Sequence, residues 1–166
     1  KKDIQYTNTI LITLHRRENL SQISNWFYAL DNIAKKYKEI KFIFPIHKNI
    51  EINKHRNILK NIEVVENLPH EELMKIFVKV KLIITDSGGI QEEASFLNKK
   101  VIVCRKSTER PEGIRSGHLH ICSNSKKLMN LFIRLNKNFK INKKSPYGDG
   151  RASKKIIKFL FKQKIL

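Results

Sequence analysis

Short, continuously apolar stretches alternate along this chain with longer segments in which apolar residues recur every three or four positions. The apolar stretches predict β-strands at Thr9–Leu14, Lys41–Pro45, Ile62–Glu66, Lys81–Thr85, Val101–Cys104 and Leu119–Cys122. The periodic segments predict helices at about Leu20–Tyr37, Ile50–Leu59, Pro69–Val78, Ile90–Leu97, Lys126–Leu135 and Arg151–Phe161. Strands that are apolar throughout are typical of a parallel sheet covered on both faces. The pattern therefore predicts a single doubly wound α/β domain over residues 1–166.

Polar clusters follow four of the predicted strands. They are His15–Asn19, His47–Asn49, Asp86–Gly89 and Arg105–Glu112. Ligands of open parallel sheets bind outside the carboxyl ends of the strands, so we expect these four clusters to meet at one edge. That edge is rich in cationic side chains, and its natural ligand is an anion.

The tetrapeptide Asp86-Ser87-Gly88-Gly89 lies between a predicted strand and a predicted helix. Paired glycines let a phosphate approach the backbone, and a helix start offers free N–H groups with a partial positive charge. The Ser87 hydroxyl is a further donor. The alternative is an ordinary strand-to-helix turn with a serine cap. The segment matches neither a Walker A loop nor GxGxxG, so it does not favour a nucleoside triphosphate or a dinucleotide.

Acidic residues follow this turn in Gln91-Glu92-Glu93. Acids in a first helical turn usually complement the helix dipole. Glu93, four residues after Gly89, is also placed to accept both hydroxyls of a ribose diol. The two features together suggest a nucleoside diphosphate along the helix start.

The histidines differ in context. His15 follows an apolar strand and precedes Arg16 and Arg17, which favours a role in an anion site, and His47 has the same placement after the second strand. His118 and His120 alternate in a strand-like stretch with no third ligand nearby, so we expect no metal there.

The chain carries 34 Lys+Arg and 15 Asp+Glu residues, which gives a formal net charge of +19. Such a charge is typical of proteins that bind nucleic acid, an anionic membrane or an acidic partner. Here the paired lysines are scattered and no nucleic-acid motif accompanies them. The chain is rich in Lys, Asn and Ile together, whose codons are all AT-rich, so we attribute most of the positive charge to this bias in composition.

The lengths of the apolar runs and the two cysteines indicate the compartment of the protein and its relation to a membrane. No apolar run approaches the roughly 20 residues of a membrane span, and the first five residues, KKDIQ, lack the apolar stretch of a signal peptide. Cys104 and Cys122 show no CxxC spacing. We expect reduced thiols in a cytoplasmic protein without a structural metal.

Five motifs together resemble the non-hydrolysing UDP-N-acetylglucosamine 2-epimerases. They are TLHRREN (Thr13–Asn19), PIHKN (Pro45–Asn49), TDSGGIQEEAS (Thr85–Ser95), TERPE (Thr108–Glu112) and PYGDGRAS (Pro146–Ser153). The match follows the order of that family's C-terminal half and covers nearly all of this chain, but about half of the family's usual length. The resemblance implies a Rossmann-like domain, the C-terminal one of a two-domain GT-B type fold with the UDP-sugar in the cleft between the domains.

The resemblance also implies roles for matching residues. His15 would contact the UDP-sugar, Glu93 would bind the ribose hydroxyls, and Arg110 would lie beside the cleft. The phosphates would be bound by Ser87, Gly88 and Gly89. In bacterial members, positions matching Arg16 and His47 help to hold a second, allosteric UDP-GlcNAc.

The implied reaction converts UDP-GlcNAc to UDP-ManNAc by anti-elimination and readdition of UDP, without a cofactor. The family's proton-transferring carboxylates belong to its N-terminal domain. We therefore expect this chain to be inactive alone and to need that domain in cis or in trans. A homodimer is a further assembly that this interpretation allows. The alternatives are a non-catalytic half-protein that binds UDP-sugars and a basic module that binds nucleic acid.

Overall fold

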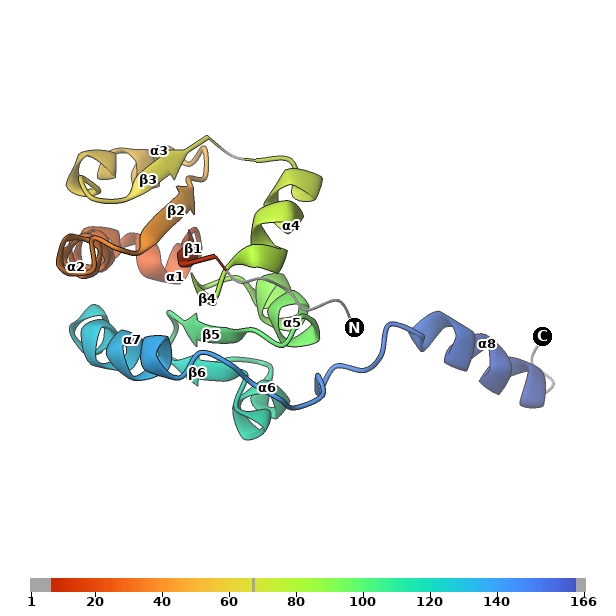
Figure 1. Ribbon diagram of the computed structural model, residues 1–166. Coiled ribbons are helices and arrows are strands. Elements are labelled where there is room, and N and C mark those ends of the chain that lie inside the picture. Colours follow the sequence, from red (N-terminus) through yellow and green to blue (C-terminus); the bar gives the residue numbers. More distant parts are fainter. Residues whose placement is uncertain (1–6, 67, 164–166) are drawn as a thin grey trace.

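The computed structural model describes residues 7–66 and 68–163 (Figure 1). The basic N-terminal start and the last three residues of the predicted domain lie outside these ranges. The described residues form a six-stranded parallel sheet with the order β3-β2-β1-β4-β5-β6. Its strands are β1 (Thr9–Thr13), β2 (Lys41–Pro45), β3 (Glu63–Val65), β4 (Leu82–Thr85), β5 (Lys100–Val103) and β6 (Leu119–Ile121). This is the strand order of dinucleotide-binding Rossmann folds, and the predicted doubly wound sheet is confirmed.

Helices cover both faces of the sheet (Figure 1). One face carries α2 (Ile23–Lys36) and α7 (Leu128–Lys137), and the other carries α4 (His70–Lys79), α5 (Gly88–Phe96) and α6 (Pro111–Ser116). Alternate residues of the fully buried β1 enter two separate hydrophobic clusters: Ile10 and Ile12 enter one, and Leu11 enters the other. Burial on both faces explains why the strands are apolar throughout.

Two predicted helices are interrupted. The segment predicted as Leu20–Tyr37 consists of a short α1 (Arg17–Leu20) and then α2, because Gln22 leaves helical geometry at φ −126° and ψ 16°. The segment predicted as Ile50–Leu59 consists of α3 (Ile50–Asn53) and a 3₁₀ turn at Arg56–Ile58. Another 3₁₀ turn, Ser125–Lys127, precedes α7.

Helix boundaries also differ at three places near the polar edge. Helix α5 begins at Gly88, two residues before the predicted start, and Pro69 is the N-cap of α4 instead of a residue of its first turn. Helix α6 lies in a segment that we predicted to be a loop, with a proline in its first turn and Gly117 at φ 81° ending it. Proline start and left-handed glycine end are the usual signals of a short helix.

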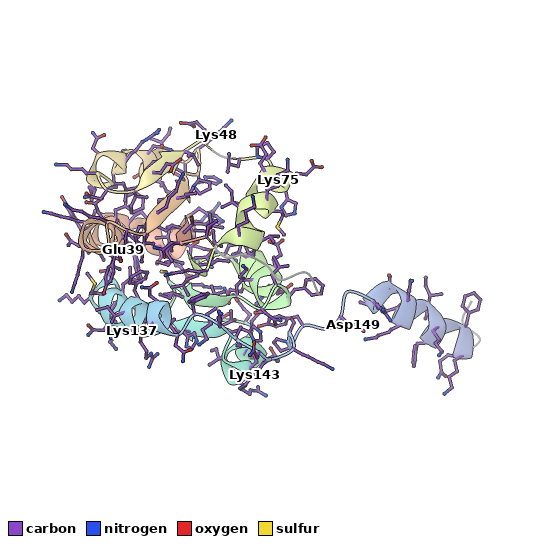
Figure 2. The ribbon with its side chains drawn as sticks, in the orientation of Figure 1. Glu39, Lys48, Lys75, Lys137, Lys143 and Asp149 are labelled. Atoms are coloured by element: carbon purple, nitrogen blue, oxygen red, sulfur yellow. The ribbon has the colours of Figure 1, made fainter. Side chains whose placement is uncertain are left out.

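The last helix, α8 (Ala152–Lys162), stands away from the sheet and its covering helices (Figure 1). Figure 2 shows its side chains extending from the ribbon beyond Asp149. None of its residues is buried, and four of its five large apolar side chains are half exposed or more: Ile156 58%, Ile157 50%, Phe159 59% and Phe161 62%.

Among the helices in the described ranges, none is both long enough and apolar enough to cross a membrane. Cys104 and Cys122 are free and buried. Burial raises the pKa of both thiols, that of Cys122 to about 11, so these cysteines behave as apolar core residues.

Candidate functional site

The four polar clusters meet at the carboxyl edge of the sheet, as predicted. They follow β2, β1, β4 and β5, which are consecutive neighbours in the strand order. An open depression of about 460 Å³ lies at this edge and is lined by His15, Arg16, Arg17, Glu18 and Arg105. Three arginines and one carboxylate give it a positive balance of charge, which suits an anionic ligand.

The segment Ser87-Gly88-Gly89 forms the start of α5. Ser87 is the N-cap, with extended backbone at φ −81° and ψ 132°, but its hydroxyl makes no capping hydrogen bond. Its own N–H donates to Thr85 Oγ1 at 2.9 Å. Ser87 thus occupies the N-cap position that the alternative expects, but its hydroxyl and the first N–H groups of this nine-residue helix remain available for an anion.

The two glycines have different surroundings. A Cβ on Gly88 would lie 2.7 Å from Arg110 Nη1, whereas a Cβ on Gly89 would meet nothing within 4 Å. Gly88 thus allows the Arg110 guanidinium to lie directly against the helix start. The result places a cation beside the free N–H groups.

Carboxylates orient Arg110 over the turn. Its Nε donates to Glu92 Oε1 at 2.6 Å, and its Nη1 lies 3.4 Å from Glu109 Oε2. The sequence left open the usual alternative that acids after the turn complement the helix dipole, and Glu92 does not follow that alternative. Because α5 begins at Gly88, its first turn contains no acid, and Glu92 pairs with the arginine instead.

A second ion-pair group lies alongside. The nearly buried Arg105 donates to Glu18 at 2.6 Å and to both oxygens of Glu109 at 2.9 Å. This bidentate contact holds the pKa of Glu109 down at about 2, and hydrogen bonds to Glu109 and Glu18 raise the pKa of Arg105. Glu109 is thus an ion-pair partner and a weak base.

His15 and His47 lie together although they follow different strands. Their rings are stacked, with centroids 5.5 Å apart and planes 13° apart. His47 Nδ1 accepts a hydrogen bond from the Asn49 N–H at 3.1 Å. The positions that resemblance assigns to two different ligands, His15 on one side and Arg16 and His47 on the other, therefore adjoin one another.

Asp86 is the residue of this site that our sequence interpretation missed. It is fully buried, and its carboxylate accepts hydrogen bonds from the backbone N–H of His15 at 3.1 Å, that of Arg16 at 2.9 Å and Asn19 Nδ2 at 2.9 Å. Asn19 Nδ2 also donates to the Cys104 carbonyl. The available signal was an acid placed between an apolar strand and Ser-Gly-Gly.

Glu93 lies in the second turn of α5, next to Glu92, and both carboxylates line one depression. It borders a mainly apolar depression of about 340 Å³, shared with Met74, Phe96 and Tyr147. Within residues 7–66 and 68–163 its carboxylate makes no hydrogen bond or ion pair. The carboxylate is available for a hydroxyl-bearing ligand, which is the role that the sequence suggested.

The motif PYGDG packs on the TERPE loop. Tyr147 Oη donates to the Arg110 carbonyl at 3.4 Å, and a Cβ on Gly113 would collide with this Tyr147 hydroxyl. Burial raises the pKa of Tyr147. Residues far apart in sequence thus support the backbone that carries Arg110.

In the described part of the chain, no group of three or more His, Cys, Asp or Glu side chains is placed to hold a metal ion. His118 is buried and hydrogen-bonded to Ser116 Oγ at 2.8 Å, and burial lowers its pKa. The burial and the hydrogen bond are typical of a histidine that stabilises the fold.

Comparison with known proteins relates this chain to one protein family. The family model described as UDP-N-acetylglucosamine 2-epimerase matches residues 1–161. The UDP-N-acetylglucosamine 2-epimerase of Campylobacter jejuni is 39% identical over 168 residues, covering 93% of this chain and 43% of that protein. The enzyme of the same name from Bacillus subtilis is 35% identical, covering 91% of this chain and 43% of that protein.

A solved structure agrees with these matches. The UDP-GlcNAc 2-epimerase of Neisseria meningitidis, bound to UDP-GlcNAc, superposes with a TM-score of 0.84 at 33% identity. The match covers 98% of this chain and 46% of that one. The chain thus spans a little under half the length of the relatives that it matches.

Proposed function

The chain belongs to the UDP-N-acetylglucosamine 2-epimerase family, and from that membership we propose that it supplies the UDP-binding half of such an enzyme. The reaction would interconvert UDP-GlcNAc and UDP-ManNAc by anti-elimination of UDP and its readdition. The observation that carries this proposal is the start of α5, where unused N–H groups, the Ser87 hydroxyl and the Arg110 guanidinium lie together.

Each group at this edge suits one part of the nucleotide. A diphosphate at Ser87, Gly88 and Gly89 would accept hydrogen bonds from the hydroxyl and the backbone, with Arg110 supplying positive charge. Glu93 would accept the two ribose hydroxyls. His15, at the rim of the open depression, would contact the sugar diphosphate.

The chemical contribution of this half is electrostatic. Elimination leaves the shared electron pair on the departing UDP oxygen, so negative charge grows on the diphosphate in the transition state. Donors already oriented by the helix start and by ion pairs stabilise that charge without reorganising. Arg110 is oriented in this way by Glu92 and Glu109.

Proton removal and return at C2 need other groups. Glu18 and Glu109 pair with Arg105, and Glu92 pairs with Arg110, so these carboxylates at the edge are already engaged by arginine. Asp86 is buried beneath the His15 loop. We therefore propose that the acid and base come from an N-terminal domain, in cis or in trans.

Regulation and assembly are further parts of the proposal. The stacked His15 and His47 support a second UDP-GlcNAc next to the first, held in part by Arg16 and His47. A homodimer would fit an enzyme with such a site. The two buried free thiols fit a reducing compartment such as the cytoplasm.

The test is an NMR assay of UDP-GlcNAc epimerisation by this chain joined to, or mixed with, a family N-terminal domain. We expect UDP-ManNAc to form, and His15→Ala to slow its formation. A matched control is His55→Ala, because His55 lies in the turn after α3 and belongs to none of the four clusters. Binding of UDP without epimerisation by the complemented protein would favour the non-catalytic half-protein instead.

A further inference from the structure

We propose that Asp86 is a positioning residue for His15: its carboxylate holds the imidazole with Nδ1 carrying the proton, so that Nε2 faces the ligand. The inference rests on the proposed UDP-sugar site for its functional meaning. Its structural part, the state of the His15 ring, depends only on contacts within this chain.

Asp86 and His15 come from neighbouring strands. Asp86 follows β4 and His15 follows β1, which pair in parallel with Thr13 opposite Thr85. The backbone N–H of His15 lies 3.1 Å from each Asp86 oxygen, and His15 Nδ1 lies 3.6 Å from Oδ1. The carboxylate therefore faces the His15 backbone and ring together.

The environment of the pair favours one orientation. Asp86 is fully buried, whereas the His15 side chain is 37% exposed and borders the open depression. Nδ1 of the ring thus lies next to a buried carboxylate, while the rest of the side chain is partly exposed at the depression. A carboxylate accepts hydrogen bonds and cannot donate one, so its negative charge favours the tautomer in which the nitrogen that faces it carries the proton.

Asp86 also joins the histidine to the phosphate turn. The residue after Asp86 is Ser87, the N-cap of α5. The Asp86 carboxylate also accepts hydrogen bonds from the Arg16 N–H and the Asn19 side-chain amide. Among the described residues, Asp86 forms no ion pair with a Lys or Arg side chain. A buried carboxylate held mainly by N–H groups of the His15 loop is costly to bury and positions that loop closely.

The first test reads the ring directly, without ligand. In the ¹⁵N-histidine-labelled chain at pH 8.5, we expect His15 to be the Nδ1–H tautomer. Asp86→Asn should shift the population towards Nε2–H, because the new amide NH₂ donates to Nδ1. Thr13→Val is the matched control: it removes the Thr13–Thr85 hydroxyl contact of 2.6 Å at the same strand ends without touching His15.

The second test asks whether Asp86 acts through His15. UDP affinity is measured for His15→Ala, Asp86→Asn and the double variant, with Thr13→Val again as control. A positioning residue predicts that Asp86→Asn weakens binding in the parent but changes it by less than about twofold in the His15→Ala background, whereas independent contributions would multiply.

Three results would overturn the proposal: an Nε2–H tautomer in the parent chain, an unchanged tautomer in folded Asp86→Asn, or losses that multiply in the double variant. The parent measurement decides the matter even where Asp86→Asn does not fold. If the chain binds no UDP, the proposed function fails, while the tautomer result still decides the Asp86–His15 contact.

Discussion

At the scale of single residues, the cations of the polar edge are held by carboxylates. Arg105 is paired with Glu18 and Glu109, and Arg110 with Glu92 and Glu109. These pairs fix the guanidinium groups before a ligand arrives, which lowers the conformational entropy that binding must remove. The carboxylates of these pairs are about half exposed, so the pairs add little stability and their main effect is on orientation.

The first prediction compares the two glycines of the phosphate turn. Gly88→Ala requires Arg110 to move, because the new Cβ would lie 2.7 Å from Nη1, whereas Gly89→Ala enters open space. We expect Gly89→Ala to raise the free energy of unfolding by up to about 1 kcal/mol, as alanine does in helices, and Gly88→Ala to give a smaller gain or a loss. Urea unfolding measures both, and equal gains would contradict the close approach of Arg110.

The second prediction concerns Glu93. Glu93→Ala should weaken UDP binding several-fold and leave pyrophosphate binding nearly unchanged, because only UDP carries a ribose diol. Calorimetry with both ligands measures the difference, and Glu93→Gln, which keeps the volume, isolates the charge. Equal losses for the two ligands would remove Glu93 from the ribose role.

The third prediction concerns pH and Lys99. This lysine is 1% exposed, its Nζ donates to the carbonyls of Val78 and Val80, and burial lowers its pKa to about 8. The folded state then binds fewer protons than the unfolded state between pH 8 and about 10.5, the usual range of lysine. Stability from this group should rise with pH across that window, by no more than about 3 kcal/mol.

Lys99→Met removes the titrating group and keeps the apolar stem. Its unfolding free energy, measured at pH 8, 9 and 10 beside the parent, should show a flatter dependence on pH. Parallel curves for the two proteins would show that the Lys99 pKa is not lowered in the folded state.

At the scale of elements, the sheet and α8 behave differently. The segments after β1, β4 and β5 are linked by hydrogen bonds through Asp86, Asn19 and the Cys104 carbonyl. Helix α8 has an apolar side and four lysines, yet no buried residue. Its amphipathic pattern alone is enough to predict a helix, but the pattern does not specify what covers the apolar side.

The fourth prediction follows for α8. A chain ending at Gly150 should have a melting temperature within about 2 °C of the parent, because none of the described side chains that the truncation removes is buried. The same truncation should reduce concentration-dependent self-association in sedimentation experiments, since it removes four exposed large apolar residues. A large drop in melting temperature would show that α8 packs on the domain in solution.

At the scale of the whole molecule, the chain is a complete Rossmann-like sheet but spans a little under half of its relatives' length. Its polar edge is open, and the depression there is lined from one side by loops of this domain. A closed and water-poor cleft needs a second wall.

The fifth prediction is that residues 1–166 alone neither epimerise UDP-GlcNAc nor release UDP from it at a useful rate. Absence of general acid–base groups alone lowers the rate by about 10²–10⁴-fold. Coupled detection of UDP and NMR of the sugar measure the two steps. Robust turnover by this chain would require a base among its own carboxylates and would contradict the proposed division of labour.

The alternation of apolar strands and amphipathic helices was enough to predict the doubly wound sheet, because burial on both faces leaves a continuous apolar signal. It also placed the four polar clusters at one edge, since carboxyl ends of parallel strands share an edge. Family membership followed from the five motifs, which are local in sequence. The assigned roles of His15, Glu93 and the other site residues stay predictions.

Tertiary structure alone decided how those residues meet. Three of these contacts join segments that lie 18 to 71 positions apart: the Arg110–Glu92 pair, the stacking of His15 on His47, and the buried hydrogen bonds of Asp86. Such contacts depend on strand order and on the paths of loops, which hydrophobic periodicity does not encode. Asp86 looked like a turn residue in the sequence, and only the pairing of β1 with β4 placed its carboxylate under His15.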